Sequence, residues 1–357
     1  MKVGIVGLPN AGKSTLFNAL TRAGAETAIY PFTTVNPNLA VVEVPDERLA
    51  PVAEAADASP LVPETIEFID IAGLVRGAAE GEGLGNRFLA QIRETAAICH
   101  VVRVHGDSEV PHPEGRVDPV ADIDAVESEL RLADLEQAGA RLERVTKAAR
   151  GGDPSAAAER EWLEAVEAEL RAEGRAAAVP VPEKARGAAA SLRLLTAKPE
   201  LIVANVEEGE AEVPEPVAER ARAGGAGAIA VSARVESELT ELDSAEAAEM
   251  RSELGLGEAG LPRLIAAAYE LLDLVTFFTA HPGADATARS LPRGGTAWDA
   301  AGRVHGEIQQ GFVRAEVIGW RELVEAGSYA AARERGALRT EGRDYVVLDG
   351  DIITIKV

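Results

Sequence analysis

GLPNAGKS, at residues 7–14, is the stretch that decides the fold of this 357-residue chain. It matches the pattern GxxxxGK[ST], in which glycines let the backbone curl until successive N–H groups point inward at an anion. A short apolar run at residues 2–6 precedes it, and residues 15–22 carry apolar side chains at helical spacing. We therefore predict a strand, a phosphate-binding loop and a helix whose positive end completes an anion site.

The polar residues of this loop have separate roles in such a site. Lys13 would bring a positive charge to the β- and γ-phosphates of a nucleoside triphosphate, and the Ser14 hydroxyl would bind Mg²⁺. A second signal, DIAG at residues 70–73, ends another apolar run. We expect Asp70 to hold the same Mg²⁺ through water, and the amide of Gly73 to approach the γ-phosphate because glycine has no Cβ. Together the two elements predict a nucleotide-binding domain of the G-domain type.

Residues 31–35, PFTTV, lie between the first predicted helix and the second predicted strand, where a threonine can complete the coordination of Mg²⁺. Thr33 and Thr34 are the alternatives, and Thr34 is the favoured one; a polar loop residue without a metal role is the other interpretation. Loss of the γ-phosphate would release this loop together with the 70–73 loop, which amounts to an order–disorder switch.

The other apolar runs predict an α/β fold. Several of them are continuous instead of alternating, which is typical of a mainly parallel sheet covered by helices on both faces. After residues 2–6, the predicted strands of this sheet are residues 39–44, 66–71, 98–104, 201–204 and 228–231.

Residues 120–197 have a different character, because apolar residues recur there at helical spacing among many charged ones. Gly-Gly-Asp-Pro at residues 151–154 interrupts the pattern, and Pro180 and Pro182 introduce a third, shorter helical run. We predict an antiparallel helical hairpin, inserted into a nucleotide-binding domain of residues 1–275. A solvated linker helix is the alternative.

The last part of the chain, residues 276–357, is expected to form a small mixed, β-rich domain. A helix should start after Thr296, its N-cap, with Asp299 at the third helical position. Asp349-Gly350 is a turn signal. The predicted strands of this domain are residues 276–279, 311–318, 345–348 and 352–357.

Composition narrows the function classes. A formal net charge of -23 argues against electrostatic binding to DNA, although a local basic patch is compatible with it. No apolar stretch approaches the roughly 18 residues of a membrane span, and the N-terminus lacks a signal-peptide pattern, so we expect a cytoplasmic protein without a membrane partner. The single cysteine, Cys99, lies in an apolar run, which predicts a buried, reduced thiol and excludes an intramolecular disulfide.

Residues 205–208, NVEE, follow a predicted strand where GTP-binding proteins carry NKxD. The aspartate of NKxD accepts hydrogen bonds from guanine N1–H and N2–H₂, and the longer Glu208 no longer fits that edge. Val206 replaces the lysine, while Asn205 can still bond the N7 acceptor and the N6 donor of adenine. These departures favour ATP over GTP.

The position after the 70–73 loop lacks the usual catalytic group. Leu74 stands where Ras-like enzymes carry a glutamine that orients the attacking water, and leucine neither donates nor accepts a hydrogen bond. Hydrolysis is therefore slow, or it depends on a loop residue, a bound cation or a partner. The loop after the fourth predicted strand offers His105, His112 and Arg116. In some related enzymes an asparagine at the position of Asn10 helps to bind K⁺, which makes K⁺ a second candidate cofactor beside Mg²⁺.

Four stretches together resemble the YchF subfamily of Obg-like ATPases: GLPNAGKST at 7–15, YPFTTVNPN at 30–38, DIAGLVRGA at 70–78 and NVEE at 205–208. The resemblance covers essentially the whole chain. It implies a P-loop G domain whose helical insert is the coiled coil of that family and whose last 80 or so residues are its TGS domain. It also implies a preference for ATP, a catalytic histidine at His112 and a last base-binding loop at Ser232-Ala233.

The resemblance further implies a ribosome partner. Acidic charge is concentrated outside the last domain, and an arginine-bearing face there could meet ribosomal RNA, although an ordinary solvated face explains the same residues. The arginines concerned are Arg289, Arg293, Arg303, Arg314, Arg321, Arg339 and Arg343.

These inferences define one candidate site and three functions. The expected function is a slow Mg²⁺-dependent ATPase whose nucleotide state controls ribosome binding; the alternatives are a GTP-specific switch and a nucleotide sensor that does not hydrolyse. The catalytic candidates are Lys13 and His112, and the metal candidates are Ser14, Thr34 and Asp70. The nucleotide-binding candidates are Asn10, Ala11, Gly12, Lys13, Ser14, Thr15, Gly73, Asn205, Val206, Glu208, Ser232 and Ala233.

Overall fold

The structure, a computed structural model, describes the chain except residues 28–37, 72–83, 107–109, 114, 152 and 255–258. It separates into two compact units, which we describe one at a time. Unit 1 comprises Met1–Val42 and Glu67–Leu271, and unit 2 comprises Glu43–Ile66 and Leu272–Val357. The second stretch of unit 2 begins at Leu272, close to the expected boundary at residue 276. Its first stretch, Glu43–Ile66, falls within the range expected for the first domain.

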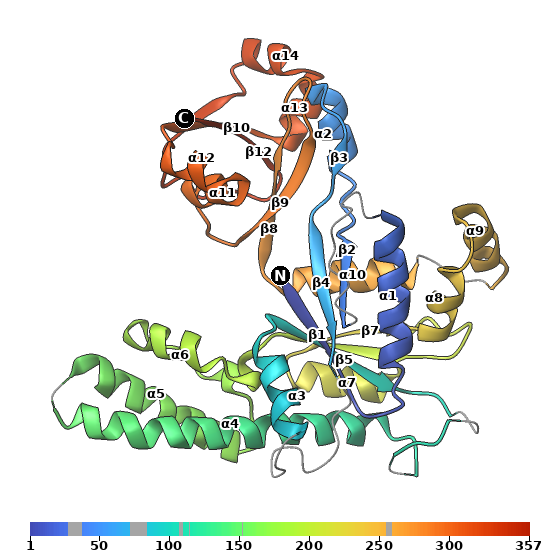
Figure 1. Ribbon diagram of the computed structural model, residues 1–357, viewed down its shortest axis with the longest axis vertical. Helices are drawn as coiled ribbons and strands as arrows, with labels where there is room; N and C mark the ends of the chain where they lie inside the picture. The colour runs from blue at the N-terminus through green and yellow to red at the C-terminus, as the bar shows by residue number, and fades with distance from the viewer. Residues whose placement is uncertain (28–37, 72–83, 107–109, 114, 152, 255–258) are drawn as a thin grey trace. The chain divides into compact units, whose positions relative to one another are not determined.

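A six-stranded sheet with the order β2-β4-β1-β5-β6-β7 forms the centre of unit 1 (Figure 1). Every pairing between β4 and β7 in this order is parallel, so the strands from β4 to β7 end at the same edge. The prediction of a mainly parallel sheet is confirmed. The strands are β1 (Lys2–Val6), β2 (Leu39–Glu43), β4 (Thr65–Asp70), β5 (Ala97–Arg103), β6 (Glu200–Asn205) and β7 (Gly227–Val231).

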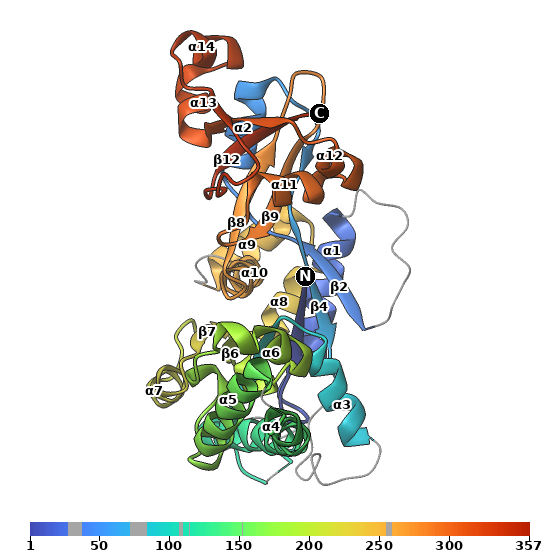
Figure 2. The same cartoon turned by 90° about the vertical axis from the view of Figure 1, so that its left-hand side faces the viewer.

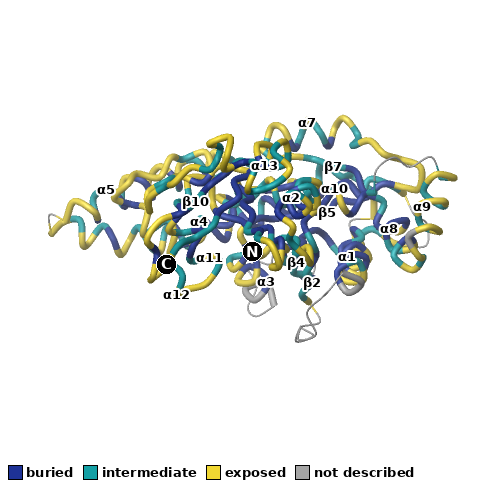
Figure 3. The backbone as a smooth tube through the Cα atoms, turned by 90° about the horizontal axis from the view of Figure 1, so that it is seen from above, coloured by how far each residue is buried: buried dark blue, intermediate teal, exposed yellow. Residues whose placement is uncertain are grey.

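Helices pack on this sheet because its strands are apolar on both faces. All of β5 is buried, as Figure 3 shows, and Cys99 is fully buried with its pKa raised to about 12 by that burial. One apolar cluster joins Ile98 of β5 to α3 and α4, and another joins Val102 to α4 and α7. The helices of unit 1 outside the insert are α1 (Lys13–Thr27), α3 (Leu84–Arg93), α7 (Glu215–Ala223), α8 (Ala233–Leu239), α9 (Ser244–Glu253) and α10 (Gly260–Glu270).

The predicted helical hairpin is present. Helix α4 (Pro119–Ala149) and helix α5 (Pro154–Arg171) lie side by side (Figures 1 and 2), and each begins after an aspartate N-cap. Trp162 and Leu163 of α5 are buried in a cluster with Val145 of α4. A third, shorter helix α6 (Arg186–Leu192) follows, as expected, with 3₁₀ turns at Ala176–Ala178, Glu183–Ala185 and Leu195–Ala197.

A buried carboxylate fixes the chain where it returns from this insert to the sheet. Asp134 of α4 is 0% exposed and accepts hydrogen bonds from the backbone N–H groups of Leu195 and Thr196, at 2.9 and 2.8 Å. The Thr196 hydroxyl donates a third bond to the same carboxylate. These bonds tie the middle of α4 to the segment that leads back into β6.

Unit 2 contains a second six-stranded sheet with the order β11-β10-β12-β8-β9-β3. Its strands are β3 (Leu61–Val62), β8 (Leu274–Thr279), β9 (Ala286–Pro292), β10 (Arg314–Gly319), β11 (Arg339–Glu341) and β12 (Asp351–Lys356). Its helices are α2 (Leu49–Ala56), α11 (Ala297–Val304), α12 (Gly306–Gln310), α13 (Trp320–Ala326) and α14 (Tyr329–Glu334). The expected β-rich domain is confirmed as a mixed α/β layer.

Two local predictions for unit 2 had opposite outcomes. The capping box at the start of α11 is confirmed, because the Thr296 side chain accepts from the Asp299 N–H while Asp299 accepts from the Thr296 N–H. The predicted strand at 345–348 is wrong. Only Val346 forms a β-bridge there, to Thr296, because the neighbouring backbone groups bond the loop that precedes α11. Within the described residues, no helix is long and apolar enough to cross a membrane.

Candidate functional site

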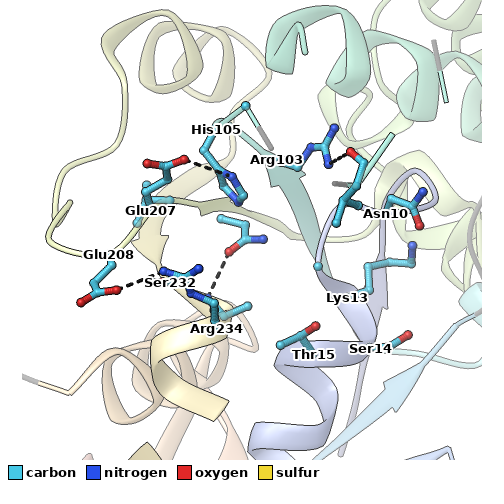
Figure 4. Close-up of a pocket in the computed structure, with 16 residues that line it drawn as sticks. Asn10, Lys13, Ser14, Thr15, Arg103, His105, Glu207, Glu208, Ser232 and Arg234 are labelled. Carbon is cyan, nitrogen blue, oxygen red and sulfur yellow. Dashed lines mark hydrogen bonds and ion pairs between the residues drawn. The ribbon is translucent and has the colours of Figure 1, made fainter. Parts of the chain in front are cut away.

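A cavity of about 780 Å³ opens where β1, β5, β6 and β7 end, which is the usual ligand position of a parallel α/β sheet (Figure 4). It brings together the predicted residues Asn10, Gly12, Lys13, Ser14, Thr15, Asn205, Val206, Glu208, Ser232 and Ala233. It also includes His105, which the sequence offered as a catalytic loop residue, and residues that were not predicted: Arg103, Gly106, Val110, Glu207 and Arg234. Thr33, Thr34, Gly73 and Leu74 lie outside the described residues.

The phosphate-binding loop adopts the conformation that its glycines permit. Gly7 and Gly12 have φ angles of 147° and 97°, in a region that side chains disfavour. A Cβ on Gly7 would lie 2.3 Å from the carbonyl oxygen of Val101, and a Cβ on Gly12 would lie 2.2 Å from Nδ2 of Asn205. Both glycines are therefore required for the close approach of the loop to β5 and β6.

Lys13 folds back onto the loop, and its ammonium group is largely buried. Its Nζ donates a 2.7 Å hydrogen bond to the Leu8 carbonyl oxygen, and the residue is 7% exposed. Burial lowers the pKa of Lys13 to about 8, against the opposing effect of the Asp70 carboxylate. A desolvated ammonium group held in this way would gain strongly from an incoming phosphate.

Two of the predicted metal ligands are adjacent. Asp70 ends β4 beside Ile5 of β1, and the Ser14 hydroxyl donates a hydrogen bond to its carboxylate. Burial raises the pKa of Asp70, and Lys13 and Ser14 partly offset that rise. A hydroxyl and a carboxylate are hard oxygen donors that suit Mg²⁺, which usually binds one or two protein oxygens together with substrate phosphates and water. The donor set therefore fits the expected metal.

Asn205 ties the phosphate loop to the loop after β7. Its Nδ2 donates a 3.0 Å bond to the carbonyl oxygen of Ala11, and its Oδ1 accepts a 3.0 Å bond from the N–H of Ala233. Both ends of the amide are thus engaged by backbone groups, which the sequence analysis did not anticipate when it assigned this side chain to adenine. Asn205 positions both loops, and its direct contact with the base stays a prediction.

The two carboxylates after β6 each have a basic partner. Glu208 accepts a 3.0 Å hydrogen bond from Arg234, and Glu207 lies 3.7 Å from Nδ1 of His105 (Figure 4). Val206, where GTP-binding proteins carry lysine, is 2% exposed and packs in an apolar cluster. This end of the cavity therefore presents one carboxylate bonded to an arginine and one beside a histidine, and it lacks the lysine.

The three loop residues considered for catalysis lie in different surroundings. His105 lines the cavity. His112 does not line it; its Nε2 lies 2.8 Å from Oδ2 of Asp122 in α4, and its side chain is 6% exposed. Arg116 is more than half exposed and pairs with Asp118. A catalytic role for His112 stays a prediction, and it requires the imidazole to leave Asp122.

Arg103 is a charged residue of the cavity that was not among the predicted site residues. It was counted within a buried apolar strand, and it is indeed buried, at 3% exposure. The signal was present in the sequence as a permanently charged residue in an otherwise apolar run, close to the strand end where ligands bind.

Comparison with known proteins gives consistent matches along the whole chain. The family model described as "50S ribosome-binding GTPase" matches residues 2–134, and the model of the YchF-GTPase C-terminal domain matches residues 274–357. The chain is 45% identical to a Bacillus subtilis protein named "Ribosome-binding ATPase YchF", over 100% of this chain and 99% of that protein. An Escherichia coli O157:H7 protein of the same name is also 45% identical, over 99% and 98%.

A solved structure supports the same grouping. The Schizosaccharomyces pombe protein titled "YchF GTPase" superposes with a TM-score of 0.88 at 33% sequence identity. The superposition covers 100% of this chain and 97% of that one. The helical insert and the β-rich C-terminal part are therefore shared with this relative.

Proposed function

Because this chain belongs to the YchF family of P-loop nucleoside triphosphatases, we propose that it is a slow, Mg²⁺-dependent ATPase whose nucleotide state controls ribosome binding. Nucleotide binding is supported by the cavity of about 780 Å³, which is lined by the P-loop and by the loops after β6 and β7. A phosphate chain at the amino end of α1 and a base at the loops after β6 and β7 would occupy its two ends.

The surroundings of Glu208 support ATP over GTP. In GTP-binding proteins the aspartate of NKxD reads guanine by accepting from N1–H and N2–H₂, whereas Glu208, at that position, already accepts a hydrogen bond from Arg234. Recognition of guanine by Glu208 would have to give up that bond, which lowers the usual advantage of guanine over adenine.

The phosphate end supports a metal-dependent site. Ser14 and Asp70 would hold Mg²⁺, which neutralises charge on the phosphates when it is bound. Lys13 would bind the phosphates directly. Asn10, at the turn of the loop with its Nδ2 bonded to the Pro111 carbonyl oxygen, is the residue that would bind K⁺ through its Oδ1.

The ribosome part rests on the relatives and on exposed arginines. Two relatives that match the full length are named ribosome-binding ATPases. Unit 2 exposes most of the arginines that the sequence analysis assigned to a ribosomal RNA contact; the exposed ones are Arg293, Arg303, Arg314, Arg321, Arg339 and Arg343. Cosedimentation with ribosomes in ATP and in ADP tests this part, and equal binding in both would contradict nucleotide control.

Calorimetric titration with Mg·ATP and Mg·GTP tests the nucleotide part. We expect ATP to bind more tightly, and GTP binding tenfold tighter than ATP, about 1.4 kcal/mol, would instead support the GTP-specific switch. Phosphate release with and without ribosomes separates the ATPase from a sensor that does not hydrolyse. Comparing K⁺ with Na⁺ in the same assay tests the second cation.

A further inference from the structure

We propose that Arg103 is a phosphate-binding residue of the nucleotide site, a second cation beside Lys13. Arg103 is the last residue of β5 and lines the cavity together with the P-loop (Figure 4). Ile98 and Val102 face the helices α3, α4 and α7, so strand alternation puts Arg103 on the opposite face. The inference rests on the proposed nucleotide site and adds a residue to it.

The guanidinium group of Arg103 is buried without an anion. Among the described residues it forms no ion pair, although it is 3% exposed and permanently charged. Two half-buried arginines of the same unit, Arg175 and Arg220, instead contact the carboxylate of Glu127. Burying an unpaired charge costs free energy, which an anion in the cavity would return.

Arg103 also has hydrogen-bonding capacity left. Its Nη1 donates a 2.9 Å bond to the carbonyl oxygen of Val110, but its Nε is buried and has no hydrogen-bond partner. A guanidinium group offers five N–H donors in a planar fork, and that fork matches two oxygens of a phosphate. The unpartnered Nε therefore marks a place where an acceptor is missing.

The chemistry of the cavity identifies the anion. Neither of its two carboxylates after β6 forms an ion pair with Arg103: Glu208 pairs with Arg234, and Glu207 lies beside His105. The cavity also contains Lys13, Asn10 and the P-loop backbone, all of which favour negative oxygens. The ligand that fits this set is the phosphate chain of a nucleotide, shared between an ammonium group and a guanidinium group.

The test compares the wild-type protein with Arg103→Gln by calorimetry with Mg·ATP and Mg·ADP, and by ligand-detected NMR with adenosine. We expect Arg103→Gln to bind ATP about tenfold to a hundredfold more weakly and to bind adenosine as the wild type does. Arg222→Gln is the matched control, because it removes an exposed arginine of α7 in the same unit. It should bind ATP normally.

Two results with Arg103→Gln would overturn the proposal, and Arg103→Lys replaces it if that variant does not fold. Arg103→Gln with wild-type ATP affinity would show that the guanidinium does not touch the phosphates. An equal loss for ATP and adenosine would show a structural role. If Arg103→Gln does not fold by circular dichroism, Arg103→Lys, which keeps the charge but not the fork, must bind ATP more weakly at unchanged adenosine affinity. Lys13→Ala separates the two claims: if it binds ATP as the wild type does, the proposed nucleotide site itself fails.

Discussion

The buried lysine of the phosphate loop predicts that ATP affinity falls as pH rises above neutrality. Burial lowers the pKa of Lys13 to about 8 in the free protein, from an ordinary value of 10.5. A bound triphosphate favours the charged ammonium form and raises that pKa, so binding takes up a proton. ATP affinity is therefore highest at pH values below the pKa of Lys13 in the free protein. It falls as pH rises from that value toward the pKa of Lys13 in the complex.

The size of the effect follows from the pKa of the free protein. At about pH 9, roughly one Lys13 in eleven keeps its proton, so the dissociation constant of ATP should be about tenfold larger than at about pH 7. If the complex restores the ordinary pKa of 10.5, the full loss amounts to about 3 kcal/mol. At about pH 8 each binding event should take up about half a proton.

Calorimetry in buffers of different ionisation enthalpy measures both quantities, since the proton uptake appears as the buffer-dependent part of the heat. Lys13→Arg is the control, because arginine keeps its charge throughout this range and its affinity should not vary with pH. A dissociation constant that stays constant between about pH 7 and 9.5, or binding without proton uptake at about pH 8, would refute the assignment of Lys13 to the phosphates.

Three substitutions test other parts of the site. Asn205→Ala should destabilise the protein by about 2 kcal/mol in urea unfolding, because the buried Ala11 carbonyl oxygen loses its donor, and should weaken ATP and GTP alike. Glu208→Asp should reduce the ATP-over-GTP affinity ratio by about tenfold in calorimetry, because the shorter carboxylate fits guanine better. His112→Ala should slow phosphate release about a hundredfold at unchanged ATP affinity; normal turnover would leave His112 only its structural contact with Asp122.

Features encoded over a few neighbouring residues were predicted correctly. The P-loop, the strands of the parallel sheet and the capping box of Thr296 and Asp299 each depend on local pattern and local backbone chemistry. The helical hairpin was equally readable, since its apolar spacing and the break before Pro154 are contiguous signals. Such elements are the ones for which local preference and the final fold agree.

Features decided by distant residues were missed. The bonds of Asn205 to Ala11 and Ala233 were not predicted, because these partners reach it only through the order of the sheet. The segment Glu43–Ile66 joins unit 2 because Leu61 and Val62 pair with β9, and that short strand had no recognisable pattern. Residues 345–348 have the composition of a strand but bond to the loop before α11 instead. Tertiary partners overrode local preference in all of these cases.

The charge of the whole chain and the charge of the site have opposite signs, and the charge of the site determines whether a nucleotide binds. A formal net charge of -23 repels a nucleotide at long range, yet salt screens this repulsion within about 8–10 Å. Two of the cations that line the cavity, Lys13 and Arg103, are 7% and 3% exposed, so water and salt screen them little. The attraction between these cations and the phosphates then exceeds the screened repulsion between the nucleotide and the rest of the chain. An acidic protein can therefore hold a polyanion where buried cations line the site.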